Sequence, residues 1–215
     1  MKARKKHVLV TAGPTREYLD PVRFLSNPST GKMGFAVAEA ALLVGCSVDL
    51  ISGPVTLDAP EGVALHEVVS AQEMFSVAKS LFEKCDFFIS VAAVSDWRPT
   101  EVTKHKIKKT YAEQVIKLLP NPDILATLAA DRRDNQTVIG FCAETEDLES
   151  HALNKLKAKR LDWIAGNLVG KASVGFQSES NELLVLNARG GRHVLGPGPK
   201  LEVAQALVQL IGLES

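Results

Sequence analysis

A short basic segment from Lys104 to Lys109 is the first candidate for chemistry, because it holds four lysines and one histidine. Ammonium groups at this density suit the phosphate oxygens of a small nucleotide. Asp96 stands ten residues before Lys106, and its carboxylate could hold a sugar hydroxyl, a base or a hydrated Mg²⁺ ion. A run of charges is also typical of a plain solvated face. The position of this segment relative to the strands therefore has to decide between a phosphate site and a plain surface.

A second candidate lies in residues 26–34, which read Ser-Asn-Pro-Ser-Thr-Gly-Lys-Met-Gly. A P-loop would need glycine at Ser26 and a hydroxyl residue at Met33, and the glycine pattern of a dinucleotide fold is missing as well. What remains is a turn rich in Ser, Thr and Gly that enters a helix. The free N–H groups of a helix N-terminus can bind an anion, and the alternative is a serine-rich loop that only caps the helix.

A third candidate combines residues 140–145 with Lys155 and Lys159 on the helix that follows. Two lysines four residues apart share one helix face and repel each other slightly, which is tolerable if an anion lies over both. The alternative is an ordinary surface. By its periodicity Phe141 belongs to the core, although its place at a strand end would also allow it to stack on a base.

Other catalytic patterns are missing from the sequence. There is neither a G-x-S-x-G elbow nor an H-E-x-x-H helix, and the five histidines show no ligand spacing. Cys46, Cys85 and Cys142 match neither a zinc spacing nor a disulfide framework, which indicates a reducing cytoplasm and three small buried hydrophobic side chains. We therefore expect no metal held by a cluster of side chains.

The composition is that of a globular protein. Twenty-five basic residues balance twenty-five acidic ones in a chain of 215 residues, so no overall field favours a nucleic acid or an anionic membrane. The longest apolar runs fall short of the ~20 residues that span a bilayer. No linker, repeat or low-complexity tract interrupts the chain, which predicts one domain over residues 1–215.

Short β-rich runs alternate with helical patterns along the chain. Expected strands are His7–Thr11, Ser47–Ser52, Val63–Val69, Asp86–Ala93, Val115–Leu118, Thr137–Phe141 and Asp162–Ala165, with a hairpin of Asn181–Asn187 and Arg192–Leu195. Expected helices are Gly34–Val44, one opened by a capping box at Ser70 and Glu73, one capped by Asn121, Asp147–Arg160 and Leu201–Ile211.

This alternation predicts an α/β fold that is Rossmann-like, with a mainly parallel central sheet, helices on both faces and a C-terminal β-hairpin. The three candidate segments each follow a strand. Because ligands bind beyond the carboxyl ends of parallel strands, the segments should gather on one rim of the sheet. The long loop Val94–Glu113 lies directly after a buried strand on that rim, and loops of this length are usually either functional or disordered.

In this order, the segments resemble the phosphopantothenate–cysteine ligase family, the ligase half of the bacterial bifunctional coenzyme A biosynthesis protein. The matching residues are Thr11–Glu17, Asp20–Arg23, Ser26-Asn27, Gly31–Gly34, Ala92–Val94, Asp96, Lys106–Lys109, Asn121–Ile124, Gly140-Phe141 and Ala143–Thr145. The resemblance covers nearly the whole chain and weakens after about Asn187.

The resemblance implies a reaction in two steps. The carboxylate of 4′-phosphopantothenate attacks the α-phosphate of CTP, which releases pyrophosphate and forms an acyl-cytidylate. The amino group of cysteine then displaces CMP to give 4′-phosphopantothenoyl-cysteine. A protein that catalyses these steps mainly has to align the reactants and offset growing negative charge. CTP and ATP are not distinguished by the residues themselves.

The resemblance also implies roles for particular residues. Lys106 would stabilise charge at the α-phosphate from a flap over the site, and Asn27 would be needed to turn over the acyl-cytidylate. The nucleotide-binding residues would be Ser90, Val91, Ala92, Asp96, Lys106, Asn121, Pro122, Asp123, Ile124, Phe141, Lys155 and Lys159. The phosphopantothenate-binding residues would be Asn27, Gly31, Lys32 and Gly34.

As partners, the resemblance implies Mg²⁺ on the nucleotide, a cytoplasmic homodimer and a flavin-dependent decarboxylase, which either a separate protein supplies or a longer chain contains. The sequence departs from the family pattern at Pro28–Thr30, Ser95–Trp97, Cys142 and Asn167-Leu168, and the last leaves the contact of Asn167 open. Two other functions stay open on the residues alone: a nicotinamide-dependent oxidoreductase, which the missing glycine pattern opposes, and a non-catalytic nucleotide-binding module.

Overall fold

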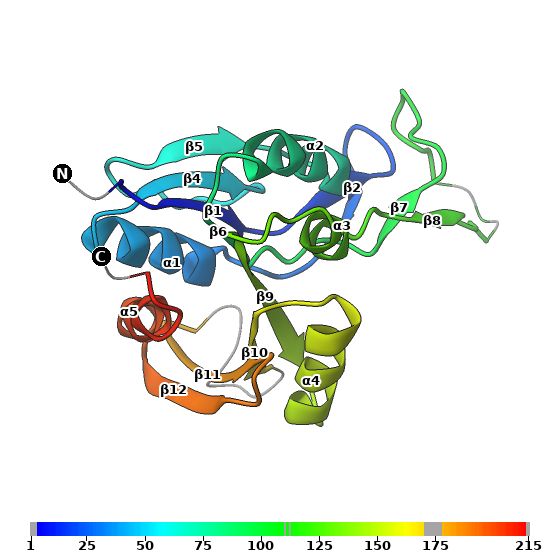
Figure 1. Cartoon of the computed structure of the whole chain (residues 1–215). Helices are drawn as coiled ribbons and strands as arrows, with labels where there is room; N and C mark the ends of the chain where they lie inside the picture. The colour runs from blue at the N-terminus through cyan, green and yellow to red at the C-terminus, as the bar shows by residue number, and fades with distance from the viewer. Residues whose placement is uncertain (1–3, 110, 112, 170–177, 214–215) are drawn as a thin grey trace.

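The computed structural model describes residues 4–109, 111, 113–169 and 178–213 (Figure 1). Its strands are β1 His7–Ala12, β2 Arg16–Tyr18, β3 Phe24–Ser26, β4 Ser47–Ser52, β5 Ala64–Glu67, β6 Phe87–Ser90, β7 Trp97–Pro99, β8 Leu118–Pro120, β9 Thr137–Glu144, β10 Trp163–Leu168, β11 Ser180–Asn187 and β12 Arg192–Pro199. Its helices are α1 Lys32–Leu43, α2 Ala71–Phe82, α3 Ile124–Ala130, α4 Leu148–Ala158 and α5 Lys200–Leu210.

The main sheet of the described residues has the strand order β12-β11-β10-β9-β6-β1-β4-β5. The strands from β5 to β10 in this order run parallel, whereas β11 and β12 are antiparallel. After β1 the chain builds one side of the sheet with β4 and β5, and then crosses to the other side with β6, β9 and β10. The direction of building thus reverses between β1 and β6, which is where open parallel sheets bind ligands. The predicted Rossmann-like fold with a C-terminal hairpin is confirmed.

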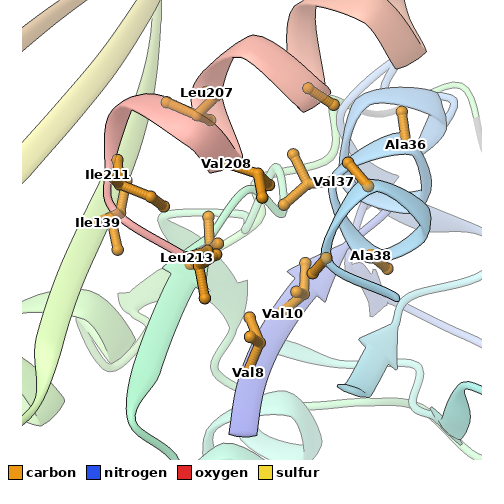
Figure 2. Packing of buried hydrophobic residues seen from close by; sticks show 14 of the residues in the cluster. Val8, Val10, Ala36, Val37, Ala38, Ile139, Leu207, Val208, Ile211 and Leu213 are labelled. Atoms are coloured by element: carbon orange, nitrogen blue, oxygen red, sulfur yellow. The ribbon is translucent and has the colours of Figure 1, made fainter. Parts of the chain in front are cut away.

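Helices cover both faces of the sheet. Along β1, Val8 and Val10 point into the core beneath α1 and α5, and Leu9 points into the core beneath α2, α3 and α4. This alternation follows from the period of two in a strand, and burial on both faces explains why β1 is almost wholly apolar. Figure 2 shows the first core, in which Val37 on α1 and Val208 on α5 pack above β1.

A two-part arm lies outside this layered body. We define the arm as the β2–β3 segment, residues 16–26, together with the β7–β8 segment, residues 97–120. Each part is a two-stranded antiparallel ribbon, and the β7–β8 part projects beyond the sheet (Figure 1). The Thr103 N–H donates to the Leu19 carbonyl over 3.0 Å, so the two parts are joined. Residues 110 and 112 of the expected long loop lie outside the described residues.

Helix α1 begins earlier than its sequence pattern predicts, at Lys32 instead of Gly34. Gly31 adopts a left-handed conformation with φ of 79° at the N-cap, and its carbonyl accepts the Phe35 N–H over 3.1 Å. The predicted end is confirmed. Gly45 and Cys46 donate to the carbonyls of Leu42 and Ala41, which is the hydrogen-bond pattern of a Schellman motif.

The predicted cap of α3 is wrong. Asp123, and not Asn121, is the N-cap, and its side chain accepts the Ala126 N–H over 2.9 Å. Asn121 is engaged elsewhere, because its amide nitrogen donates to the Ser95 carbonyl over 2.8 Å. The capping box of α2 is confirmed, with Ser70 accepting the Glu73 N–H over 3.2 Å.

Strand lengths account for the other differences. The strand expected over Val115–Leu118 is instead β8, which starts at Leu118, and the strand expected over Asp86–Ala93 ends at Ser90. Beyond Ser90 the chain keeps only one isolated parallel bridge, between Ala93 and Pro14. All three cysteines are buried and free, as expected. None of the helices in the described part of the chain has the length and apolar character needed to cross a bilayer.

Candidate functional site

Two adjoining cavities lie at the carboxyl ends of β1, β6 and β9, where the strand order reverses. The segment after β6 is tied to the turn after β1, because the Ala93 N–H donates to the Gly13 carbonyl over 2.9 Å and the Ser95 N–H donates to the Thr15 hydroxyl over 2.9 Å. Thr15 is fully buried at this seam between the two strand ends. The cavities open on either side of it.

Cavity A has a volume of about 120 Å³ and lies over the first turn of α1. Its lining comes from the carboxyl ends of β1, β6, β9 and β10, the start of β11, the turn before α1, the first turn of α1 and the start of α5. The lining residues are Gly13, Ser29, Thr30, Gly31, Lys32, Met33, Gly34, Val91, Ala92, Ala93, Phe141, Cys142, Ala143, Asn167, Asn181 and Lys200.

The first turn of α1 makes cavity A suitable for an anion. Gly31 has no side chain to cap the helix, so the backbone N–H groups at its start are open to another partner. The positive end of the helix dipole adds to their attraction for negative charge. Lys32 supplies a full positive charge at the same place, and Ser29 and Thr30 supply hydroxyl groups.

Cavity B has a volume of about 550 Å³, within the range of small-molecule sites. It runs from the seam after β6 to the start of α3 and along α4. The lining residues are Asn27, Ser90, Ala92, Ala93, Val94, Ser95, Asp96, Asn121, Pro122, Asp123, Ile124, Leu125, Phe141, Cys142, Ala143, Lys155, Lys159 and Val169.

Cavity B is polar at its rim because Asp96, Asp123, Lys155 and Lys159 line it. The Lys155 ammonium lies 2.7 Å from a Glu144 carboxylate oxygen, and the Lys159 ammonium lies 2.8 Å from an Asp123 carboxylate oxygen. These pairs relieve the repulsion between two lysines on one helix face. The pairs are partly exposed and hence weak, so an entering anion can compete for both ammonium groups.

The two cavities share one wall, made of Ala92, Ala93 and residues 141–143. Strand β9 continues past the end of β6, since Ser90 pairs with Gly140, and its next residues therefore face both spaces. Burial raises the pKa of the Cys142 thiol to about 11; the Lys155 charge opposes this shift and Glu144 adds to it. The thiol is protonated at neutral pH and is not a nucleophile, so Cys142 serves as part of the wall.

Asn27 stands beside the shared wall. Its side-chain amide donates to the Ala93 carbonyl over 3.0 Å, which fixes the side chain at the border of cavity B. The same carbonyl accepts the Thr15 N–H over 3.3 Å. Asn27 directly follows β3 of the arm, so this short strand positions its side chain.

Lys106 lines neither cavity in this structure. Its loop is fastened to the β2–β3 part of the arm by Asp20, a fully buried carboxylate that accepts the N–H groups of Val22, Arg23 and Ile107 at 2.8, 2.8 and 3.1 Å. Burial alone would raise the pKa of Asp20, but these three donors and the Arg23 guanidinium outweigh it and hold the pKa below its ordinary value. Asp20 is therefore charged at neutral pH and holds the backbone next to Lys106.

The structure brings most of the expected nucleotide residues together. Those that line cavity B are Ser90, Ala92, Asp96, Asn121, Pro122, Asp123, Ile124, Phe141, Lys155 and Lys159. Val91 lines cavity A instead, and so do Gly31, Lys32 and Gly34, whereas Asn27 lines cavity B. Asn181 and Lys200 were not predicted as site residues, and they reach cavity A from the C-terminal hairpin and α5.

Comparison with known families gives a match over almost the whole chain. The DNA/pantothenate metabolism flavoprotein C-terminal domain matches residues 3–213. The chain is similar to the coenzyme A biosynthesis bifunctional protein CoaBC of Vibrio cholerae, with 45% identity over 208 residues that cover 96% of the chain and 52% of the relative. The corresponding protein of Bacillus subtilis is 44% identical, with 96% and 51% covered. The chain thus spans about half the length of the curated relatives it matches.

Two solved structures share the fold. A crystal structure of the C-terminal domain of CoaBC has a TM-score of 0.81 and 38% identity, and the match covers 96% of this chain and 93% of that one. A Cab2 mutant solved in complex with phosphopantothenate-cysteine has a TM-score of 0.82 over 97% of this chain and 85% of the other. At 19% identity, this second likeness concerns the fold alone.

Proposed function

Because the chain belongs to the DNA/pantothenate metabolism flavoprotein C-terminal domain family, we propose that it is a phosphopantothenate–cysteine ligase in coenzyme A biosynthesis. The observation that carries this proposal is the pair of cavities that share one wall. Joining two substrates through an activated intermediate needs one space for the acid and one for the nucleotide, with their reacting ends in contact. Cavity A, with its helix N-terminus and lysines, suits a phosphorylated acid, and cavity B suits the nucleotide.

In the proposed reaction, the carboxylate of 4′-phosphopantothenate attacks the α-phosphate of CTP near the shared wall. The bond to the β-phosphate breaks, pyrophosphate leaves, and an acyl-cytidylate remains. The amino nitrogen of cysteine then attacks the acyl carbon, CMP leaves, and the nitrogen gives up a proton as the amide forms. Lys155 and Lys159 face the side of cavity B where phosphates would lie, and their charges would offset the negative charge there.

The proposed nucleotide carries Mg²⁺, and the residues present fit that role. No group of three or more metal-binding side chains occurs among the described residues, so the chain itself offers no closed metal cage. Mg²⁺ is usually held by substrate phosphates with only one or two carboxylates, and Asp96 at the rim of cavity B is available for this. The ion would neutralise charge on the phosphates.

Incubation of the protein with phosphopantothenate, cysteine, CTP and Mg²⁺ should release pyrophosphate and CMP in amounts equal to the amide formed. Omission of phosphopantothenate should stop the release, because it supplies the attacking carboxylate. The same assay with ATP in place of CTP should be slower, which tests the nucleotide that we assign. If CTP binds but stays intact in the complete mixture, the protein is a nucleotide-binding module and the proposal is wrong.

We also propose that the arm joins two copies of the chain into a homodimer. Most of the exposed large hydrophobic side chains of the described residues lie on the arm, at Val22, Phe24, Trp97, Val102, Tyr111, Val115, Ile116, Leu118 and Leu119. Apolar side chains gathered in this way usually mark an interface. In a dimer with a two-fold axis, the same patch of each copy covers that of the other copy. Such dimers are the commonest form of assembly.

Leu118→Asp should convert the dimer to a monomer at micromolar concentration. The substitution removes apolar burial worth about 2 kcal/mol and places a charge in the interface, so the dimer dissociation constant should rise at least about 30-fold. Sedimentation equilibrium measures it. Leu43→Asp, the same change at an exposed leucine of α1 outside the arm, should leave the dimer intact. An unchanged dissociation constant in Leu118→Asp would place the interface elsewhere.

The curated relatives are bifunctional, and the chain spans about half of their length. We propose that the product of this ligase passes to a flavin-dependent decarboxylase, either fused to this chain or separate from it.

A further inference from the structure

Lys200 is a buried lysine whose place is costly for the fold. It is the first residue of α5, its side chain lines cavity A, and only 7% of its surface is exposed. A cation in the first turn of a helix is opposed by the helix dipole, and burial of an ammonium group costs free energy as well. Its ammonium donates to the carbonyls of Ser178 and Ser180.

Burial lowers the pKa of Lys200, the neighbouring Lys32 lowers it further, and Glu179 opposes the shift. Lys32 thus stands close enough to Lys200 to disfavour the charge of Lys200. Lys32 likewise occupies the first position of a helix, α1, and lines the same cavity. Both lysines are placed against a helix dipole beside the same cavity. This unfavourable placement is explained if an anion binds between them.

Glu179 is the counter-ion of this pair in the structure. Its carboxylate accepts a hydrogen bond from the Lys32 ammonium, and the charges of Lys32 and Lys200 both lower the pKa of Glu179. The Glu179 side chain is 82% exposed, in contrast to 29% for Lys32. With the two lysines it also lines a surface groove next to cavity A. The glutamate therefore approaches the lysines from the solvent side.

We infer that Lys200 and Lys32 together form the cationic end of cavity A, which selects a phosphorylated acid over its unphosphorylated form. When the phosphate binds, it replaces the Glu179 carboxylate as the hydrogen-bond partner of Lys32. This inference rests on the proposed function. A phosphate dianion offers two charges for the two ammonium groups, and more acceptor oxygens than a carboxylate has for the hydroxyls of Ser29 and Thr30. Glu179 returns to water at little cost because it is largely exposed already.

Lys200→Met separates phosphate recognition from a structural role. The KM for phosphopantothenate is expected to rise about 10- to 100-fold with little change in kcat, because one charged contact to the phosphate is lost. Inhibition by pantothenate, which lacks the phosphate, is measured alongside, and its inhibition constant should change less than about 2-fold. Lys200→Arg keeps the charge and should restore most of the affinity.

Glu179→Gln removes the resident counter-ion and should lower the KM for phosphopantothenate several-fold. Glu182→Gln, the same change at an exposed carboxylate of β11 outside cavity A, should leave it unchanged. If Lys200→Met weakens phosphopantothenate and pantothenate by the same factor, Lys200 acts only through the fold and the inference is wrong. If the unmodified protein consumes no phosphopantothenate, it is the proposed function that fails.

Discussion

Lys106→Met is expected to slow pyrophosphate release at least about 100-fold, which corresponds to about 2.7 kcal/mol of transition-state stabilisation. Negative charge builds on the α-phosphate as the carboxylate attacks, and an ammonium group at that point offsets it. The KM for CTP should change much less, since Lys155 and Lys159 would hold the nucleotide in the ground state. Steady-state pyrophosphate release at saturating CTP measures the effect.

The position of Lys106 makes this prediction demanding. Its loop is held at Ile107 by Asp20, and Lys106 lines neither cavity, so the loop has to change position before the Lys106 ammonium can contact a nucleotide in cavity B. Lys104→Met removes a charge from the same exposed loop and should retain activity within about 2-fold. Equal losses in Lys104→Met and Lys106→Met would mean that the loop acts only through its summed charge.

The sequence predicted the layered body well because strands that are buried on both faces carry an unmistakable apolar pattern. β1 and β4 were placed almost to the residue for this reason. The strand order was not predictable, because which strands become neighbours depends on how whole helices pack across the sheet. In the arm, β2, β3 and β7 were missed and β8 was expected too early, since each of these strands has three residues, too few for any periodicity to appear.

The roles of Asn27 and Lys106 came from the family resemblance. The rim on which the candidate segments gather followed from one rule, that parallel strands end on the same edge of the sheet. The segments after β1, β6 and β9 obey it and meet around the shared wall. The rule does not apply to Asn181, which lies on the antiparallel hairpin, or to Lys200, which lies on α5. The place of α5 beside α1 is decided by packing between distant parts of the chain. Isolated polar residues of this kind carry no local pattern.

Asn27→Asp is expected to stop the proposed reaction after its first half. One equivalent of pyrophosphate should be released per site, and amide formation should then fall at least about 100-fold, so the acyl-cytidylate accumulates. The aspartate has nearly the shape of asparagine but cannot donate to the Ala93 carbonyl, over the 3.0 Å contact that now fixes the side chain. It also brings a negative charge close to the acyl phosphate group of the intermediate, which is itself negatively charged.

Rapid-quench measurement with labelled CTP separates the two halves of the reaction, because the burst of pyrophosphate reports activation and the labelled acyl-cytidylate reports the stalled second step. Asn154→Asp makes the same change on the exposed surface of α4, outside both cavities, and should complete turnover normally. The decisive observation is the ratio of the two half-reactions. If pyrophosphate release and amide formation fall together in Asn27→Asp, Asn27 acts in activation or in binding the acid, and its place beside the shared wall serves the first step instead of the second.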